Sequence, residues 1–175
     1  MMFDLQPVLT GELISLRPLK EGDREDLFAV ASDPLLWELH PQSDRYQRPV
    51  FDALFDQSIN SKGALVVLDA KSGKIIGSSR YYDLNPERKS VAIGYTFLAR
   101  AFCGGNYNRE MKKLMLDHAF RFAETAIFHV GKNNLRSRKA MEKIGGELVG
   151  EEQRTLADGS PNPSVVYRVT KALAK

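Results

Sequence analysis

The chain has 175 residues, 43% of them hydrophobic and 27% charged, which are the proportions of an ordinary globular protein forming one domain over residues 1–175. Its net charge of +3 is compatible with an acidic ligand without requiring nucleic acid, and its single cysteine, Cys103, excludes a disulfide framework. No segment has the pattern of a signal peptide or a membrane span, so we expect a cytoplasmic protein that needs neither a membrane nor a metal ion.

The first half of the chain mixes strand-like and helix-like patterns. Asp23 is suited to cap a helix whose apolar side includes Leu27 and Ala31, and Asp33-Pro34 is expected to end it. Alternating runs joined by short turns favour an antiparallel meander. The predicted elements are a strand at 12–17, a helix after Asp23, a loop at 40–49, a helix at 50–59, and strands at 64–68, 75–82 and 90–98.

A strand, a turn of small residues and a helix follow one another between Ser90 and Phe122. The turn is Phe102–Asn108, and the helix after it has apolar residues at 111, 114, 115, 119 and 122, which share one helical face. The first backbone N–H groups of such a helix lack intrahelical partners, and its dipole adds partial positive charge. The unit therefore predicts an anion site, with phosphate as the expected ligand.

The last third of the chain predicts a strand, a helix and two more strands. Residues 126–130 form the first strand, and Asn133-Asn134 is suited to cap a helix from 135 to 144 that stops at Gly145-Gly146. Strands at 147–155 and 164–170 are joined by a loop containing Asp-Gly and two prolines. The element order predicts the α/β (α+β) class, with a mixed, mostly antiparallel sheet.

Two motifs in this order resemble those of the GNAT acyltransferases, which use acetyl-CoA. One is Ile93-Gly94-Tyr95 followed by residues 102–110, and the other is Asn134-Leu135-Arg136-Ser137 running on to Glu142-Lys143-Ile144-Gly145. The resemblance covers nearly the whole chain and is closest to the branch that includes ribosomal-protein N-terminal acetyltransferases. It implies a sheet of about seven strands, flanked by about four helices and splayed in the middle.

The resemblance implies residues that would hold coenzyme A. The pantetheine arm would pair with the backbone of Phe97 and Leu98, and the strand after Leu98 would splay away from 127–129 to leave a gap for the thioester. The 3′-phosphate would contact Arg138 and Lys139, unless their helix face is simply solvated. The pyrophosphate would lie on the backbone of Gly104, Gly105, Asn106, Tyr107 and Asn108.

This sequence departs from the family pattern at four positions. Asn106 replaces the second glycine, so we expect a left-handed backbone there at some strain. Arg109 stands where a small residue is usual, and would either contact or obstruct the phosphate. Ala92 and Met141 stand where many members carry a glutamate and a tyrosine, which removes the obvious base and the obvious acid.

Three residues are expected to act at the reaction centre. In the related branch a serine of the second motif can protonate the leaving thiolate, and here that serine is Ser137. Asn134 would contact the pantetheine, and the alternative for both residues is an ordinary helix cap. His129 flanks the expected gap, and its reference pKa of about 6.5 suits proton abstraction, the alternative being a structural role.

Other polar residues near the motifs have their own alternatives. Tyr95 is a candidate for orienting the substrate, and His118 on the central helix is a candidate for chemistry. Glu110 is expected to stabilise the helix N-terminus through the dipole. Cys103 lies beside that N-terminus, which would lower its pKa and favour a nucleophile, although phosphate would compete for the same place.

The sequence thus predicts an N-acetyltransferase that moves an acetyl group from acetyl-CoA directly to a primary amine, on a protein N-terminus or a small molecule. The family often dimerises, so a homodimer is an open possibility. The alternative, which Ala92 and Met141 favour, is a coenzyme A-binding sensor or partner module without turnover. Nucleic-acid binding is not expected, since the charge excess is small and the basic run lacks aromatic residues.

Overall fold

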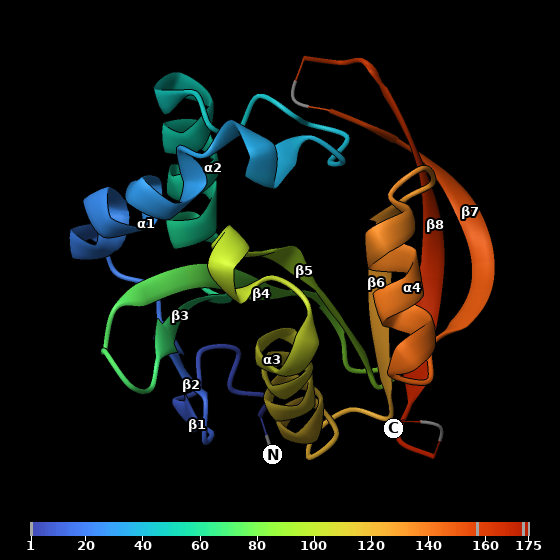
Figure 1. The fold of residues 1–175 in the computed structure, drawn as a ribbon. Helices are drawn as coiled ribbons and strands as arrows, with labels where there is room; N and C mark the ends of the chain where they lie inside the picture. The colour runs from blue at the N-terminus through green and yellow to red at the C-terminus, as the bar shows by residue number, and fades with distance from the viewer. Residues whose placement is uncertain (1, 157, 173, 175) are drawn as a thin grey trace.

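A computed structural model describes residues 2–156, 158–172 and 174, and an eight-stranded sheet runs through it in the order β1-β2-β3-β4-β5-β6-β8-β7 (Figure 1). The strands are β1 (Leu9–Thr10), β2 (Ile14–Pro18), β3 (Ala64–Asp69), β4 (Ile75–Asn85), β5 (Ser90–Leu98), β6 (Thr125–Gly131), β7 (Glu147–Thr155) and β8 (Pro161–Thr170). The α-helices are α1 (Arg24–Ala31), α2 (Arg48–Ser61), α3 (Gly105–Ala119) and α4 (Leu135–Lys143), with 3-10 turns at Glu21–Asp23, Pro34–Trp37 and Arg100–Phe102. This arrangement confirms the predicted mixed α/β class and is close to the expected element count.

The strand directions follow from the lengths of the connections. Strands β3, β4 and β5 form the predicted antiparallel meander, and β6, β8 and β7 form a second antiparallel group. The pair β5–β6 is parallel, because the chain must cross over through α3 between them. Figure 1 shows the two groups on opposite sides of the molecule, with α3 below their junction and α4 in front of β6.

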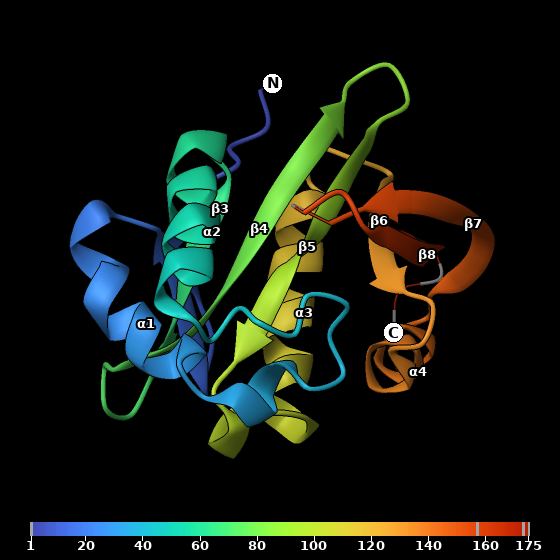
Figure 2. The same ribbon diagram turned by 90° about the horizontal axis from the view of Figure 1, so that it is seen from above.

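Each face of the sheet buries its own apolar cluster. One cluster joins Met111 and Met115 of α3 and Met141 of α4 to side chains of the central strands. The other joins Leu27 of α1 and Phe51 of α2 to the opposite face of the sheet. Figure 2 shows α1 and α2 together on one side of β4. Among the described residues, every helix is too short or too polar to cross a lipid bilayer.

The element boundaries differ from the predictions mainly at the ends. The sequence pattern missed β1, whose two residues are too few to show a periodicity. Helix α2 begins at Arg48 rather than at 50, because a proline in the first turn has no N–H to lose. Strand β8 begins at Pro161, whereas its prolines had indicated a loop. Strands β5 and β7 have the predicted bounds.

Strands β5 and β6 pair only at their first residues and then separate. The pairs are Ser90–Thr125, Val91–Ala126 and Ala92–Ile127, and the described residues contain no further pairing between these strands. The separation therefore begins after Ala92, six residues earlier than the expected position after Leu98. The gap is bordered by Ile93–Leu98 of β5 on one side and by Phe128–Gly131 of β6 on the other.

A β-bulge distorts β5 at the start of this gap. Strand β4 pairs through Ser78–Phe97 and then through Arg80–Gly94, so β5 holds one extra residue between these pairs. Tyr95 lies in the bulge with a φ of 53°, a left-handed conformation that costs an L-residue free energy. Such strain persists only where surrounding contacts impose it and is concentrated at functional sites.

Glu110 ties α3 to the start of the sheet. Its carboxylate accepts hydrogen bonds from the backbone N–H groups of Glu12, Leu13 and Ile14, at 3.0, 2.7 and 2.8 Å. The expected role at the N-terminus of its own helix is therefore wrong, because the carboxylate is engaged by another segment. A β-carbon at Gly11 would lie 2.6 Å from this carboxyl group, which explains the glycine there.

Candidate active site

The turn before α3 forms an open cradle of backbone N–H groups. The left-handed conformations fall on Gly104 and Gly105, with φ values of 72° and 56°, while Asn106 is not among the residues with positive φ. The strain expected at Asn106 is therefore absent, because Asn106 already belongs to the helix. A β-carbon added to either glycine would meet no heavy atom within 4 Å, so the turn is not filled by its own side chains.

The charge around this cradle favours an anion. The first turn of α3 contains no acidic residue and no side-chain cap, so its leading N–H groups are free to bind a ligand. Arg100 and Arg136 lie near enough for their charges to lower the pKa of Cys103. Phe102 packs edge-on against Tyr107, with ring centroids 4.9 Å apart, and so supports the turn.

Cys103 does not have the environment of a nucleophile. Loss of solvation raises the pKa of its thiol, and this effect exceeds the opposing effect of the two arginines. Its sulfur lies 3.1 Å from the carbonyl oxygen of Leu98 and donates a hydrogen bond to it. The pKa lowering expected from the helix N-terminus is therefore wrong in direction.

Lys112 brings a buried ammonium group to the gap from the α3 side. The residue is 7% exposed, its Nζ lies 3.5 Å from Thr96 Oγ1 of β5, and it lies 5.1 Å from the ring centroid of Phe128 of β6. Burial lowers the pKa of Lys112 to about 8. Lys112 was not among the predicted site residues, although a lysine three residues before the buried Met115 interrupts the apolar stripe of the helix.

His129 lines the opposite side of the gap. Its Nδ1 lies 3.0 Å from Glu152 Oε2, and this contact becomes an ion pair only when the ring is protonated. Burial and the charge of Arg154 lower the pKa of His129, and Glu152 opposes them only in part. The imidazole is therefore neutral at pH 7 and able to accept a proton.

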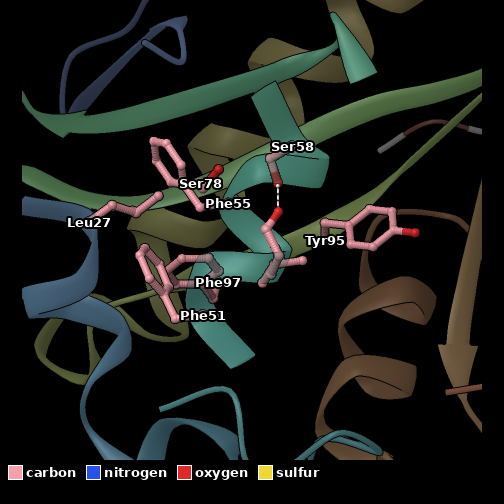
Figure 3. A pocket seen from close by; sticks show the side chains of 8 residues that line it. Leu27, Phe51, Phe55, Ser58, Ser78, Tyr95 and Phe97 are labelled. Carbon is pink, nitrogen blue, oxygen red and sulfur yellow. Dashed lines mark hydrogen bonds between the residues drawn. The ribbon is translucent and has the colours of Figure 1, made fainter. Parts of the chain in front are cut away.

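Two tyrosines connect His129 to the bulge in β5. The ring of Tyr82 lies 6.3 Å from the His129 ring and 5.3 Å from the Tyr95 ring. Figure 3 shows Tyr95 directed away from Phe51 and Phe97, which line a small pocket under α2. The neutral imidazole and both tyrosines thus share the face of the sheet that α1 and α2 cover.

The sequence matches the family model of the acetyltransferase (GNAT) domain over residues 14–147, which is more than half of the chain. The chain belongs to the GNAT acetyltransferase family. The match includes both sequence motifs and the splayed part of the sheet. No curated protein is significantly similar to this GNAT sequence.

Solved structures share the whole GNAT fold. A crystal structure of an acetyltransferase from T. thermophilus has 26% identity and a TM-score of 0.78, covering 95% of this chain and 90% of that one. Mycobacterium smegmatis RimJ, in complex with CoA-disulfide, has 18% identity, a TM-score of 0.72 and coverages of 95% and 86%. Spermidine N-acetyltransferase from Vibrio cholerae, in complex with CoA and spermine, has 17% identity, a TM-score of 0.71 and coverages of 93% and 98%.

The second GNAT motif lies at the start of α4. Asn134 caps this helix, since its Oδ1 accepts a hydrogen bond of 3.3 Å from the backbone N–H of Ser137. Ser137 is half-buried, and within the described part of the chain only its backbone N–H, not its hydroxyl, forms a hydrogen bond with a side chain. The structure therefore shows the capping role of Asn134 and leaves the Ser137 hydroxyl available.

Four other residues singled out in the sequence lie outside the gap or bond to neighbouring protein groups. The guanidinium of Arg138 donates to Tyr167 Oη at 3.1 Å and to the Lys132 carbonyl at 3.0 Å, and these two bonds fix its position, while Lys139 is exposed. His118 lies 2.7 Å, through Nε2, from the Asp4 carbonyl oxygen. Met141 is 3% exposed in the apolar core. His118 and Met141 thus face packed protein rather than the gap.

Proposed function

We propose that this GNAT protein binds acetyl-CoA and transfers the acetyl group directly to a primary amine, on a protein N-terminus or a small molecule. The observation that carries the proposal is the combination of an open N–H cradle and a gap with a proton-holding group on each side. Gly104, Gly105, Asn106, Tyr107 and Asn108 would hold the pyrophosphate, and Phe97 and Leu98 would flank the pantetheine arm. Acetyl-CoA supplies an acetyl group activated as a thioester.

His129 would take the proton that the amine must lose. The Glu152 carboxylate near Nδ1 favours the ring proton on that atom, which leaves Nε2 as the acceptor. A neutral imidazole accepts a proton without first losing one, so the lowered pKa suits this role at pH 7. With His129 in this role, the protein would not need the glutamate and the tyrosine that many relatives carry at the positions of Ala92 and Met141.

Lys112 would hold a proton on the other side of the gap. Within the described residues no carboxylate forms an ion pair with its Nζ, so its proton is available to a group that develops negative charge in the gap. A pKa of about 8 keeps the amine largely protonated at pH 7 while lowering the cost of giving the proton up. The hydroxyl of Ser137 and the amide of Asn134 would support the same side from α4.

A coenzyme A-binding module without turnover is the second candidate. The observation that favours it is the replacement of two usual catalytic side chains by Ala92 and Met141, both buried. A panel of amines with a thiol-release assay separates the two. Transfer to any amine that disappears in Lys112→Met or His129→Gln rules out the silent module.

The cradle predicts the effect of a single charge. Asn106→Asp keeps the size of the side chain but adds a negative charge to the first turn of α3. The helix should become slightly more stable through its dipole, while a bound pyrophosphate is repelled, so the Kd for coenzyme A should rise about 10-fold or more. Calorimetric titration measures the Kd, and Asn106→Ser is the neutral control that should keep it. Unchanged affinity in Asn106→Asp would place the phosphate elsewhere.

The pKa of His129 predicts the pH dependence of the reaction. Because burial lowers this pKa, kcat/KM should be constant near pH 7 and fall only as the pH drops below about 6.5. In His129→Gln the acid limb should vanish, and kcat should fall roughly 100-fold. NMR titration of the imidazole gives the pKa independently, and Glu152→Gln should lower it further. An acid limb that persists in His129→Gln assigns the base to another group.

A further inference from the structure

Arg80 is a buried cation without a carboxylate partner on the α1–α2 face. It is 4% exposed, its Cζ lies 3.8 Å from the ring centroid of Tyr95, and its Nη2 donates to Ser58 Oγ at 2.6 Å. Its buried Nε has no hydrogen-bond partner in the described part of the chain. Burial lowers the pKa of Arg80, and only the two tyrosines oppose it. A buried donor without an acceptor costs free energy unless a ligand satisfies it.

Arg45 brings a second guanidinium to the same region from the loop between the 3-10 turn at Trp37 and α2. Its Cζ lies 5.6 Å from the Trp37 ring, and its Nε donates to Gln42 Oε1 at 3.2 Å. Its Nη1 lies 3.3 Å from His40 Nε2. The pKa of Arg45 is lowered to about 10, mainly by burial and in addition by the charge of Arg80.

The His40 ring offers no acceptor to Nη1 of Arg45. Burial lowers the pKa of His40 to about 3, so the ring is neutral and has one proton. The Nδ1 of His40 accepts the backbone N–H of Gln42 at 3.0 Å, so the proton is on Nε2. Two donors, Nε2–H of His40 and Nη1–H of Arg45, therefore meet with no acceptor between them.

Other arginines in this half of the chain form ion pairs with carboxylates. Arg24 pairs with Glu21, Asp52 and Asp56, and Arg48 pairs with Glu25 and Asp52. Arg80 is buried and Arg45 is partly buried, yet neither forms an ion pair within the described residues, and Asp44 has only the weakest effect on the pKa of Arg45. Unpaired buried cations destabilise a folded chain, so their presence indicates a negative group supplied from outside.

We propose that the acceptor amine carries a carboxylate or a phosphate, which Arg45, Arg80 and the Nε2–H of His40 hold while the amine lies near His129. This substrate class rests on the proposed acetyl transfer. Tyr95 links the two parts, since Arg80 stacks on its ring and Tyr82 joins that ring to His129. A polyamine would meet two like charges and is a poor fit.

Matched acceptor pairs test the substrate class. Phenylalanine against phenylalaninamide tests the carboxylate, and glucosamine 6-phosphate against glucosamine tests the phosphate, with spermidine as a polycation. We expect the anionic member of at least one pair to have a kcat/KM about 10-fold higher or more, because charge-assisted hydrogen bonds hold it. In Arg45→Gln and Arg80→Met the ratio should fall to about one, with an unchanged Kd for coenzyme A. Equal or better use of both neutral members, or of spermidine, overturns the proposal.

A second measurement does not depend on turnover. Trp37 is the single tryptophan of the chain and lies under Arg45, so its fluorescence reports on this site. With coenzyme A present to fill the cradle, inorganic phosphate should change this fluorescence saturably in the wild type and in Arg88→Gln, but not in Arg45→Gln. No saturable change, or a change that survives in Arg45→Gln, overturns the anion site. Failure to bind coenzyme A in calorimetry instead overturns the proposed function.

Discussion

Lys112→Met is expected to reduce kcat about 100-fold while making the protein more stable at pH 7. Methionine fills a similar volume without the charge, so it removes a proton donor from the gap together with the cost of burying an ammonium group. Lowering the pKa from 10.5 to about 8 corresponds to a cost on the order of 3 kcal/mol at pH 7, an upper limit for the gain.

The same pKa predicts how stability depends on pH. The folded state binds the Lys112 proton more weakly than the unfolded state, so the unfolded state holds more protons between about pH 8 and pH 10.5. The free energy of unfolding of the wild type should therefore rise with pH through this window relative to Lys112→Met. Below pH 8 both states are protonated, and the difference between the two proteins should be constant.

Lys113→Met is the matched control for Lys112→Met. Lys113 is the next residue, its side chain is 69% exposed, and it pairs with Asp117 across one helical turn. Its replacement should leave kcat unchanged and alter stability by less than about 0.5 kcal/mol. Urea unfolding at pH 7 and pH 10, with acetyl transfer to the best acceptor, measures both. A wild-type kcat in Lys112→Met would show that Lys112 takes no part in the reaction. A lower free energy of unfolding in Lys112→Met than in the wild type at pH 7 would refute the proposed cost of burying the ammonium group.

Glu110→Gln is expected to lower the free energy of unfolding by about 3 kcal/mol, because one ionised side chain serves three backbone donors. The carboxylate accepts from Glu12, Leu13 and Ile14, whereas the NH₂ group of glutamine would face a donor. The start of α3 should loosen with the β1–β2 hairpin, so affinity for coenzyme A should fall as well.

Urea unfolding and calorimetry measure the two effects of Glu110→Gln. Glu124→Gln is the control, because Glu124 makes one exposed pair with Lys89 at 3.4 Å and should change stability by less than about 1 kcal/mol. Equal stability of the two variants would mean that the three hydrogen bonds add nothing beyond what water supplies to the unfolded chain. Hydrogen exchange at the N–H groups of Leu13 and Ile14 would show directly whether the anchor is lost.

Features that depend on neighbouring residues could be predicted from the amino-acid sequence. Strand β5 and the turn before α3 were readable because hydrophobic alternation, small residues and an apolar helical stripe are local signals. The anion cradle followed from them, since its donors are consecutive backbone N–H groups. Even here the predicted position of the left-handed backbone was wrong, because Gly104 and Gly105 adopt it and Asn106 already belongs to α3.

The side chains that line the gap could not be predicted in this way, because folding brings them together from distant parts of the chain. Lys112 meets Thr96 and Phe128 because β5 and β6 separate above α3, and the sequence does not state where a pair of strands stops pairing. Arg45 and Arg80 come from a loop and a strand that are far apart in the sequence, and their lack of carboxylates is a property of packing. Burial, which sets the pKa of each of these groups, depends on contacts across the whole sheet rather than on neighbours in the chain.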